Sequence, residues 1–171
     1  MPQANNAFLN LAGEFAVASE LNRRRVLASV TYGASKCADI FALSPDMTRV
    51  VHIEVKATNP KKKTRWLIGE RGTRPSVAAD VLWVFVLFPA APDRACADDA
   101  QRGAHAPRFF VLSQNEVYEA WKKESEDYNH RRKDRGQEPL EGLGVPGVRL
   151  GDIEQHEAKW QKNHLTLANS P

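Results

Sequence analysis

Asp39, Glu54 and Lys56 are the residues of this sequence whose types and spacing best suit chemistry. Two carboxylates brought within a few ångströms repel each other unless a cation lies between them. Mg²⁺ is a suitable cation, because it needs one or two carboxylates and keeps its other positions for water and phosphate. A lysine on the same strand face could orient or deprotonate an attacking water and stabilise the charge of a pentacovalent phosphorane.

Two neighbouring strand patterns are expected to position these residues. Residues 38–43 read as a short strand, and residues 50–58 alternate between polar and apolar side chains, so that Glu54 and Lys56 share one face. Ser44, Pro45 and Asp46 between the two strands are a turn signal. If the strands pair through this turn, one face of the sheet carries Asp39, Glu54 and Lys56 together. The alternative is that Glu54 and Lys56 are a solvated cross-strand pair and Asp39 is an acid near a turn.

The charge of the chain is unevenly distributed. Residues 22–74 hold twelve basic and four acidic side chains, a net charge of +8, while the whole chain carries +3, so the remainder carries −5. A positive face of this kind suits a polyanion, although basic runs are also common as solvated helix ends and loops. Trp66 lies among these charges and could stack on a base. The candidate nucleic-acid-binding residues are Arg23, Arg24, Arg25, Lys61, Lys62, Lys63, Arg65 and Trp66.

On these residues the chain resembles the PD-(D/E)xK nuclease superfamily, which has the restriction-endonuclease-like fold. The resemblance rests on Gly13-Glu14 in a first helix, Ala38-Asp39-Ile40 on one strand and Glu54-Val55-Lys56 on the next. It covers about residues 8–112, and Ala38 stands where the motif has proline.

The resemblance implies a role for each of these residues. Asp39 and Glu54 would bind the metal, Mg²⁺ with Mn²⁺ as a substitute, and the Val55 carbonyl would complete its shell. Lys56 would be the catalytic lysine, and Glu14 would be an additional acidic residue. Many such enzymes cut both strands as dimers, so the analogy also implies a homodimer.

Hydrophobic periodicity and turn signals predict an α/β fold with a mixed central sheet flanked by helices. A single nuclease-like domain is expected over residues 1–171, with its core at about 8–112 and a C-terminal helical extension at 113–171. Ser113 and Glu116 have the spacing of a capping box, and residues 81–88 are apolar on both faces, as in a central strand. Helices are expected at 5–22, near 76–80, from 114 toward 130 and at 154–162. Further strands are expected at 26–32 and 108–112, with a short one from 148, and loops are expected at 90–107 and 136–147.

Composition excludes several classes of protein. The chain has 171 residues, of which 42% are hydrophobic and 26% are charged, which is typical of a globular domain rather than of a disordered chain. The longest apolar run, residues 81–88, is far shorter than the roughly 20 residues of a membrane helix. No signal-peptide pattern is present, and Cys37 and Cys96 are too few for a zinc knuckle or a disulfide framework. A cytoplasmic protein without a membrane segment is therefore expected.

These observations lead to the hypothesis of a Mg²⁺-dependent endodeoxyribonuclease that hydrolyses phosphodiester bonds in DNA, with RNA left open as a substrate. Two alternatives remain: a non-catalytic nucleic-acid-binding module that keeps the nuclease fold, and a protein-interaction module.

Overall fold

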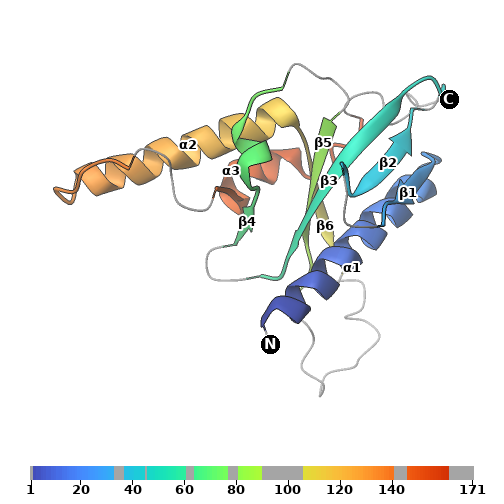
Figure 1. The fold of residues 1–171 in the computed structure, drawn as a ribbon, viewed down its shortest axis with the longest axis horizontal. Helices are drawn as coiled ribbons and strands as arrows, with labels where there is room; N and C mark the ends of the chain where they lie inside the picture. Colours follow the sequence, from blue (N-terminus) through green and yellow to red (C-terminus); the bar gives the residue numbers. More distant parts are fainter. Residues whose placement is uncertain are drawn as a thin grey trace.

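The computed structural model describes residues 2–32, 37–44, 46–60, 64–76, 81–89, 106–140 and 146–161 (Figure 1). The predicted α/β class is confirmed. In chain order the elements are α1 (Pro2–Arg23), β1 (Ala28–Val30), β2 (Ile40–Leu43), β3 (Val50–Thr58), β4 (Arg65–Leu67), η1 (Glu70–Thr73), β5 (Val81–Leu87), β6 (Arg108–Ser113), α2 (Gln114–Lys133), β7 (Gly147–Arg149), α3 (Leu150–Ile153) and η3 (Glu154–His156).

The main sheet has five strands in the order β1-β2-β3-β5-β6. The first three form an antiparallel meander, β3 and β5 are parallel, and β5 and β6 are antiparallel. The sheet is therefore mixed, as predicted, and β5 lies inside it with six of its seven residues buried. A second sheet pairs β4 with β7.

The two long helices cover opposite faces of the main sheet. Along β5, Leu82, Val84 and Val86 pack with α1, whereas Trp83 and Phe85 belong to the cluster that includes residues of α2. Because successive strand residues point to opposite faces, these two clusters are the two sides of one sheet. The parallel register places Glu54 beside Trp83 and Lys56 beside Phe85, so the polar residues of β3 lie on the α2 side.

Gly13 allows α1 to approach β3 closely. A Cβ atom at Gly13 would lie 2.7 Å from the Cβ of Ala57, which is closer than side chains can pack. At the other side of the sheet, Ser113 caps α2: its hydroxyl accepts from the Glu116 N–H, and the Glu116 carboxylate accepts from the Ser113 N–H at 2.7 Å. The predicted capping box is thereby confirmed.

The C-terminal segment differs from the prediction. The expected helix at 154–162 is wrong: α3 ends at Ile153, η3 ends at His156, and Ala158 has a left-handed φ of 53°. The chain then runs beside β6, where the Ala158 N–H donates to the Phe109 carbonyl at 2.9 Å. Trp160 enters the cluster on the α1 side with 1% of its surface exposed, so the hydrophobic core is not confined to residues 8–112.

The basic segment after β3 contains β4 and η1, which the sequence did not predict. The first helix begins at Pro2 rather than Asn5, β1 and β2 are shorter than expected, and α2 extends to Lys133. The expected helix at 76–80 and the loop at 90–107 lie mostly outside the described residues. None of the described helices is both long and apolar enough to cross a membrane.

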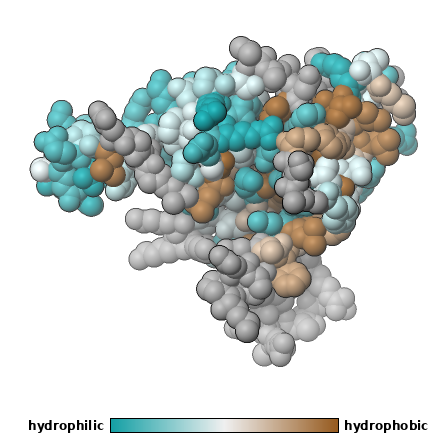
Figure 2. Space-filling model, in the orientation of Figure 1, coloured by the Kyte–Doolittle hydropathy of each residue, from teal (hydrophilic) through white to brown (hydrophobic). Residues whose placement is uncertain are grey.

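One end of the main sheet exposes apolar side chains. Figure 2 shows hydrophobic residues gathered over β1, β2 and β3, while α2 is largely hydrophilic. Leu27, Met47 and Val50 contribute to this surface, and Leu27 is 59% exposed. A hollow of about 420 Å³ there is lined by Leu27, Ser29, Phe41, Ala42, Leu43 and Val50.

A compact turn fixes the register of β2 against β3. The Ser44 N–H donates to the Arg49 carbonyl at 2.9 Å, and the Ser44 hydroxyl accepts from the Arg49 N–H at 3.0 Å. The Asp46 carboxylate accepts from the Ser44 hydroxyl at 2.5 Å and from the Thr48 N–H at 3.2 Å. The Ser44 hydrogen bond, with those from Thr48, lowers the pKa of Asp46 to about 2.

We predict that carboxyl NMR will give Asp46 a titration midpoint of about 2. Because the folded-state pKa lies below the ordinary value of 3.8, ionised Asp46 stabilises the turn above about pH 4. That contribution is lost as the pH falls toward 2. Ser44→Ala should move the midpoint back up toward 3.8, since it removes the largest cause of the shift. A midpoint near 4 in the unsubstituted protein would contradict the described turn.

We predict that Trp160→Ala destabilises the protein by about 3–5 kcal/mol, because a buried indole is removed and a cavity is left. Its ring lies 5.5 Å from that of Phe109. Equilibrium unfolding in urea measures the loss. Phe8→Ala is the matched control, since Phe8 is 73% exposed, and it should change the free energy of unfolding by less than about 0.5 kcal/mol. Equal effects of the two substitutions would contradict the placement of Trp160.

Candidate functional site

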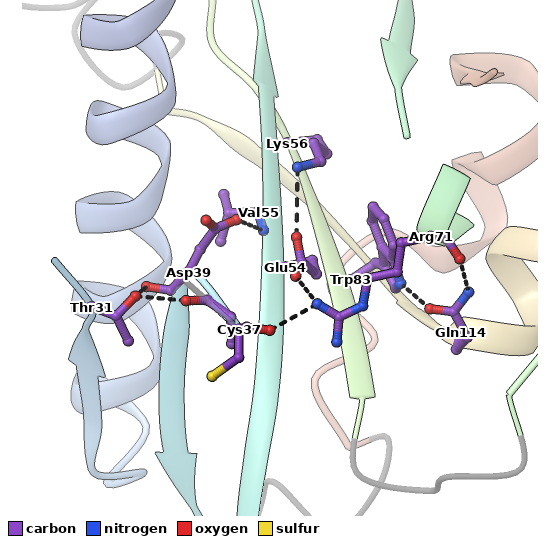
Figure 3. A network of polar contacts seen from close by, with 10 residues as sticks. Thr31, Cys37, Asp39, Glu54, Val55, Lys56, Arg71, Trp83 and Gln114 are labelled. Atoms are coloured by element: carbon purple, nitrogen blue, oxygen red, sulfur yellow. Dashed lines mark hydrogen bonds and ion pairs between the residues drawn. The ribbon is translucent and has the colours of Figure 1, made fainter. Parts of the chain in front are cut away.

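Asp39 lies where the pairing of β2 with β3 ends. Its backbone N–H donates to the Ile53 carbonyl at 3.0 Å, and its carboxylate Oδ2 accepts from the Val55 N–H at 2.8 Å. The carboxylate therefore takes the place of a strand carbonyl as the acceptor for β3. Asp39 binds the backbone of both neighbours of Glu54, so the structure brings these two predicted residues together (Figure 3).

The Glu54 carboxylate lies between two cations. Its Oε2 is 3.6 Å from the Lys56 Nζ, and its Oε1 accepts from the Arg71 Nη1. Only 13% of the Glu54 side chain is exposed, compared with 31% for Lys56 and 42% for Arg71. In Figure 3 these three side chains point toward one another on the α2 side of β3. Arg71 belongs to this group, although its sequence context marked it only as one charge of a basic region.

Lys56 is held over an aromatic ring. Its Nζ lies 5.6 Å from the centroid of Trp83, a cation–π distance. Lys56 borders a hollow of about 480 Å³ whose wall includes residues of α1, the end of β3 and β4. A second hollow of about 360 Å³ is bordered by Arg71 together with Arg74, Ser76, Val81 and Gln114. The cluster of Glu54, Lys56 and Arg71 thus has one hollow beside its lysine and another beside its arginine.

Gln114, the first residue of α2, holds the turn that carries Arg71. Its Oε1 accepts from the Trp83 Nε1 at 2.7 Å, and its Nε2 donates to the carbonyls of Arg71 and Arg74 at 2.8 and 2.7 Å. The indole nitrogen can only donate, which fixes the orientation of the amide. Gln114 is 4% exposed, so the backbone of η1 is anchored to buried groups. The Arg71 side chain extends from this anchor to Glu54 and to the Cys37 carbonyl, at 2.8 Å.

The donor groups at this site fit a hard divalent cation. Asp39 and Glu54 provide two carboxylates, and the Val55 carbonyl points to the same edge of β3 as its N–H, which Asp39 binds. Mg²⁺ is commonly held by one or two carboxylates together with waters. Among the described residues, no group of three or more His, Cys, Asp or Glu side chains is placed to hold a metal. A cation at this site would have two carboxylates as side-chain ligands, and it would compete with Arg71 and Lys56 for Glu54.

Glu14 is buried in α1, with 6% of its surface exposed. The preceding Gly13 is the residue at which α1 meets Ala57 of β3. Glu14 thus comes from the helix that covers the opposite face of the sheet from Glu54 and Lys56. It could reach the cluster only around the edge of β3 at which β2 has ended. Its part in a metal shell stays a prediction.

One expectation for nucleic-acid contact is wrong. Trp66 is 2% exposed, its Nε1 donates to the Val86 carbonyl at 3.1 Å, and its ring packs edge-on against Phe85 and Phe110. A base cannot stack on this ring, because the apolar core already covers it. Arg65, one residue earlier, binds the buried Glu124 at 2.9 Å.

The other predicted basic residues differ in their surroundings. Arg23 and Arg24 both bind Glu20, at 2.9 and 2.7 Å, and the hydrogen bond from Arg23 lowers the pKa of Glu20. Arg24 also lies over the Trp160 ring, at 5.3 Å. Arg25 follows the helix with a left-handed φ of 64°. Lys61, Lys62 and Lys63 lie outside the described residues.

Comparison with known proteins gives no match to a protein-family model and no match to a curated protein.

We predict that Gln114→Leu destabilises the protein by about 1–3 kcal/mol, because it leaves the buried Trp83 N–H without its acceptor. Urea unfolding, followed by tryptophan fluorescence, measures this loss. Gln137→Leu is the matched control on an exposed residue after α2, with an expected change within about 0.5 kcal/mol. The anchoring role of Gln114 is refuted if both variants unfold at the same urea concentration.

Proposed function

We propose that this protein is a metal-dependent nuclease that hydrolyses phosphodiester bonds in DNA. The observation that carries the proposal is the grouping of Asp39, Glu54 and Lys56 at the end of the β2–β3 ladder, with Lys56 in contact with Glu54. Two carboxylates can hold a metal ion that activates water and polarises the phosphate, and an ammonium beside them can stabilise the developing negative charge. Mg²⁺ is the proposed cofactor, with Mn²⁺ as a substitute.

Each residue has a task that its position allows. Asp39, Glu54 and the Val55 carbonyl would hold the metal, which supplies Lewis-acid stabilisation of the phosphate and activates water. Lys56 borders both Glu54 and the hollow of about 480 Å³, so its ammonium can orient a water or stabilise negative charge on the phosphate oxygens. Trp83 limits the directions available to this ammonium.

The surroundings of the cluster favour a polymeric substrate over a small phosphate ester. One hollow borders Lys56 and another borders Arg71, so a ligand that enters both must reach from one of these residues to the other. Basic residues dominate this part of the sequence, which supports binding to a polyanion. DNA binding should accordingly weaken steeply as the salt concentration rises, because phosphate contacts release counterions.

A second function, non-catalytic nucleic-acid binding, is favoured by one specific observation. Arg71 and Lys56 already neutralise the Glu54 carboxylate without any metal. If this arrangement is permanent, the cluster is a structural ion network and the protein binds DNA without cleaving it. The two functions therefore differ in what happens when Glu54 and Lys56 are replaced.

We predict that the protein nicks supercoiled plasmid in Mg²⁺ or Mn²⁺ but not in EDTA. Glu54→Gln and Lys56→Ala should each slow nicking at least about a hundredfold, since each removes a group that stabilises charge in the transition state. Gel electrophoresis of plasmid over time measures the rate. Linear and branched DNA, tested in parallel, would define the preferred substrate.

Two exposed residues of α2 provide matched controls. Glu119→Gln and Lys122→Ala make the same kinds of change on exposed positions and should nick plasmid at the unsubstituted rate. Binding of DNA without nicking, unaffected by Glu54→Gln, would replace the nuclease with the binding module. Nicking that persists in Glu54→Gln at full rate would place the active site elsewhere or in a contaminant.

A further inference from the structure

Arg71 is the group in closest contact with the proposed metal ligand Glu54. Its Nη1 donates both to Glu54 and to the Cys37 carbonyl, and therefore connects β3 to the segment that precedes Asp39. A cation that bound the Glu54 carboxylate would have to compete with this guanidinium. Arg71 is thus a built-in counter-ion for a residue that the proposed chemistry requires to be available.

The guanidinium has capacity beyond this contact. Within the described part of the chain, its polar contacts all run through Nη1, so Nε and Nη2 can still donate to a ligand. Arg71 also borders the hollow of about 360 Å³, where Arg74, Ser76 and the acidic Glu70, which pairs with Arg74 at 3.5 Å, are further polar neighbours. A planar guanidinium with donors on two edges is well suited to bind phosphate oxygens in a bidentate manner.

The backbone and the side chain of Arg71 differ in freedom. The backbone of η1 is anchored by Gln114, whose amide is buried, whereas the guanidinium side chain is 42% exposed. A rotation of the side chain alone could therefore move the charge between Glu54 and the adjacent hollow without any change of the fold. The Arg71 guanidinium can therefore bind either the Glu54 carboxylate or an anion in the adjacent hollow.

We propose that Arg71 is a phosphate-binding residue of the nuclease site, and that its guanidinium is bound to Glu54 when no metal is present. A divalent cation and Arg71 compete for the Glu54 carboxylate. When the cation binds, the guanidinium turns to a phosphate of the DNA strand in the hollow beside η1. This inference rests on the proposed function, since it needs a metal at Glu54 and a phosphodiester substrate.

The first measurement is the affinity for Mn²⁺ by isothermal titration calorimetry, in the full chain without DNA. Arg71→Ala should bind Mn²⁺ about threefold to tenfold more tightly than the unsubstituted protein, because the competitor for Glu54 is removed. Arg74→Ala is the matched control. Arg74 is three residues along and 75% exposed, so its removal changes the local charge without freeing Glu54 and should leave the Mn²⁺ affinity unchanged. Arg71→Lys keeps the charge but loses the planar guanidinium, so its Mn²⁺ affinity should lie between those of Arg71→Ala and the unsubstituted protein.

The second measurement is plasmid nicking at a Mn²⁺ concentration that saturates every variant. Arg71→Ala should nick at least about tenfold more slowly although it binds the metal more tightly, because a phosphate contact is lost. A purely structural role for Arg71 would weaken both properties together. Circular dichroism and thermal unfolding of each variant identify any loss of fold, in which case Arg71→Lys carries the comparison.

Each remaining outcome overturns a specific part of the inference. Unchanged Mn²⁺ affinity in Arg71→Ala would exclude competition for Glu54, and the same gain in Arg74→Ala would reduce it to a general charge effect. Tighter Mn²⁺ binding with an unchanged nicking rate would exclude the phosphate contact. If the unsubstituted protein binds no Mn²⁺, or binds it equally well in Glu54→Gln, the proposed function itself fails, which is a different result from the failure of Arg71.

Discussion

The end of the ladder between β2 and β3 is the constraint on which the candidate site depends. β3 is nine residues long, but β2 has only four, so the edge of β3 beyond Ile53 needs another acceptor. Asp39 supplies it through its carboxylate, which accepts the Val55 N–H. The Asp39 carboxylate is thereby held beside the middle of β3, at Val55, and the next residue of β3 is Lys56. A longer β2 would cover this edge with backbone and leave no room for a carboxylate.

The other contacts of β3 keep this edge open and in place. On one side, Gly13 brings α1 close enough to pack directly on Ala57, which fixes the height of β3 above the helix. On the other side, the seven-residue parallel pairing with β5 sets Glu54 beside Trp83. Trp83 then binds Gln114, and Gln114 holds the turn of Arg71. The position of the Glu54 carboxylate therefore depends on four segments that lie far apart in the sequence: α1, β5, α2 and η1.

The elements predicted correctly from the sequence are those whose environment imposes a simple period. The alternation in β3 follows from its position with one apolar face against α1, and the unbroken apolar run of β5 follows from burial on both faces. β4 was missed because it has three residues, too few for a period, and because its partner lies about eighty residues away. For β7 the predicted short strand from Val148 is confirmed, but its pairing with β4 was not predicted. The helix expected after β7 is wrong because Trp160 is pulled into the core and Ala158 breaks the helical path with its positive φ.

The same reasoning explains the outcome at the site. The grouping of Asp39, Glu54 and Lys56 could be predicted because the turn between β2 and β3 is local and the spacing of Glu54 and Lys56 is that of one strand face. The prediction that Trp66 contacts nucleic acid was wrong because the charges near it in sequence do not show that it is the buried middle residue of the short strand β4. Arg71 could not be singled out, since its contact with Glu54 depends on an anchor in α2 that is distant in sequence.

Charge balance connects these residues to the chemistry proposed for them. Asp39, Glu54, Lys56 and Arg71 carry formal charges that cancel, which suits a partly buried cluster without a bound ligand. A divalent cation alone would leave the cluster with an excess of positive charge, and a phosphodiester alone would bring negative charge without relieving the pairing at Glu54. A phosphodiester bound together with the cation offsets half of the charge that the cation brings, provided that one resident cation changes its partner. Since coupling between two ligands is reciprocal, the metal should strengthen DNA binding by the same factor by which DNA strengthens metal binding.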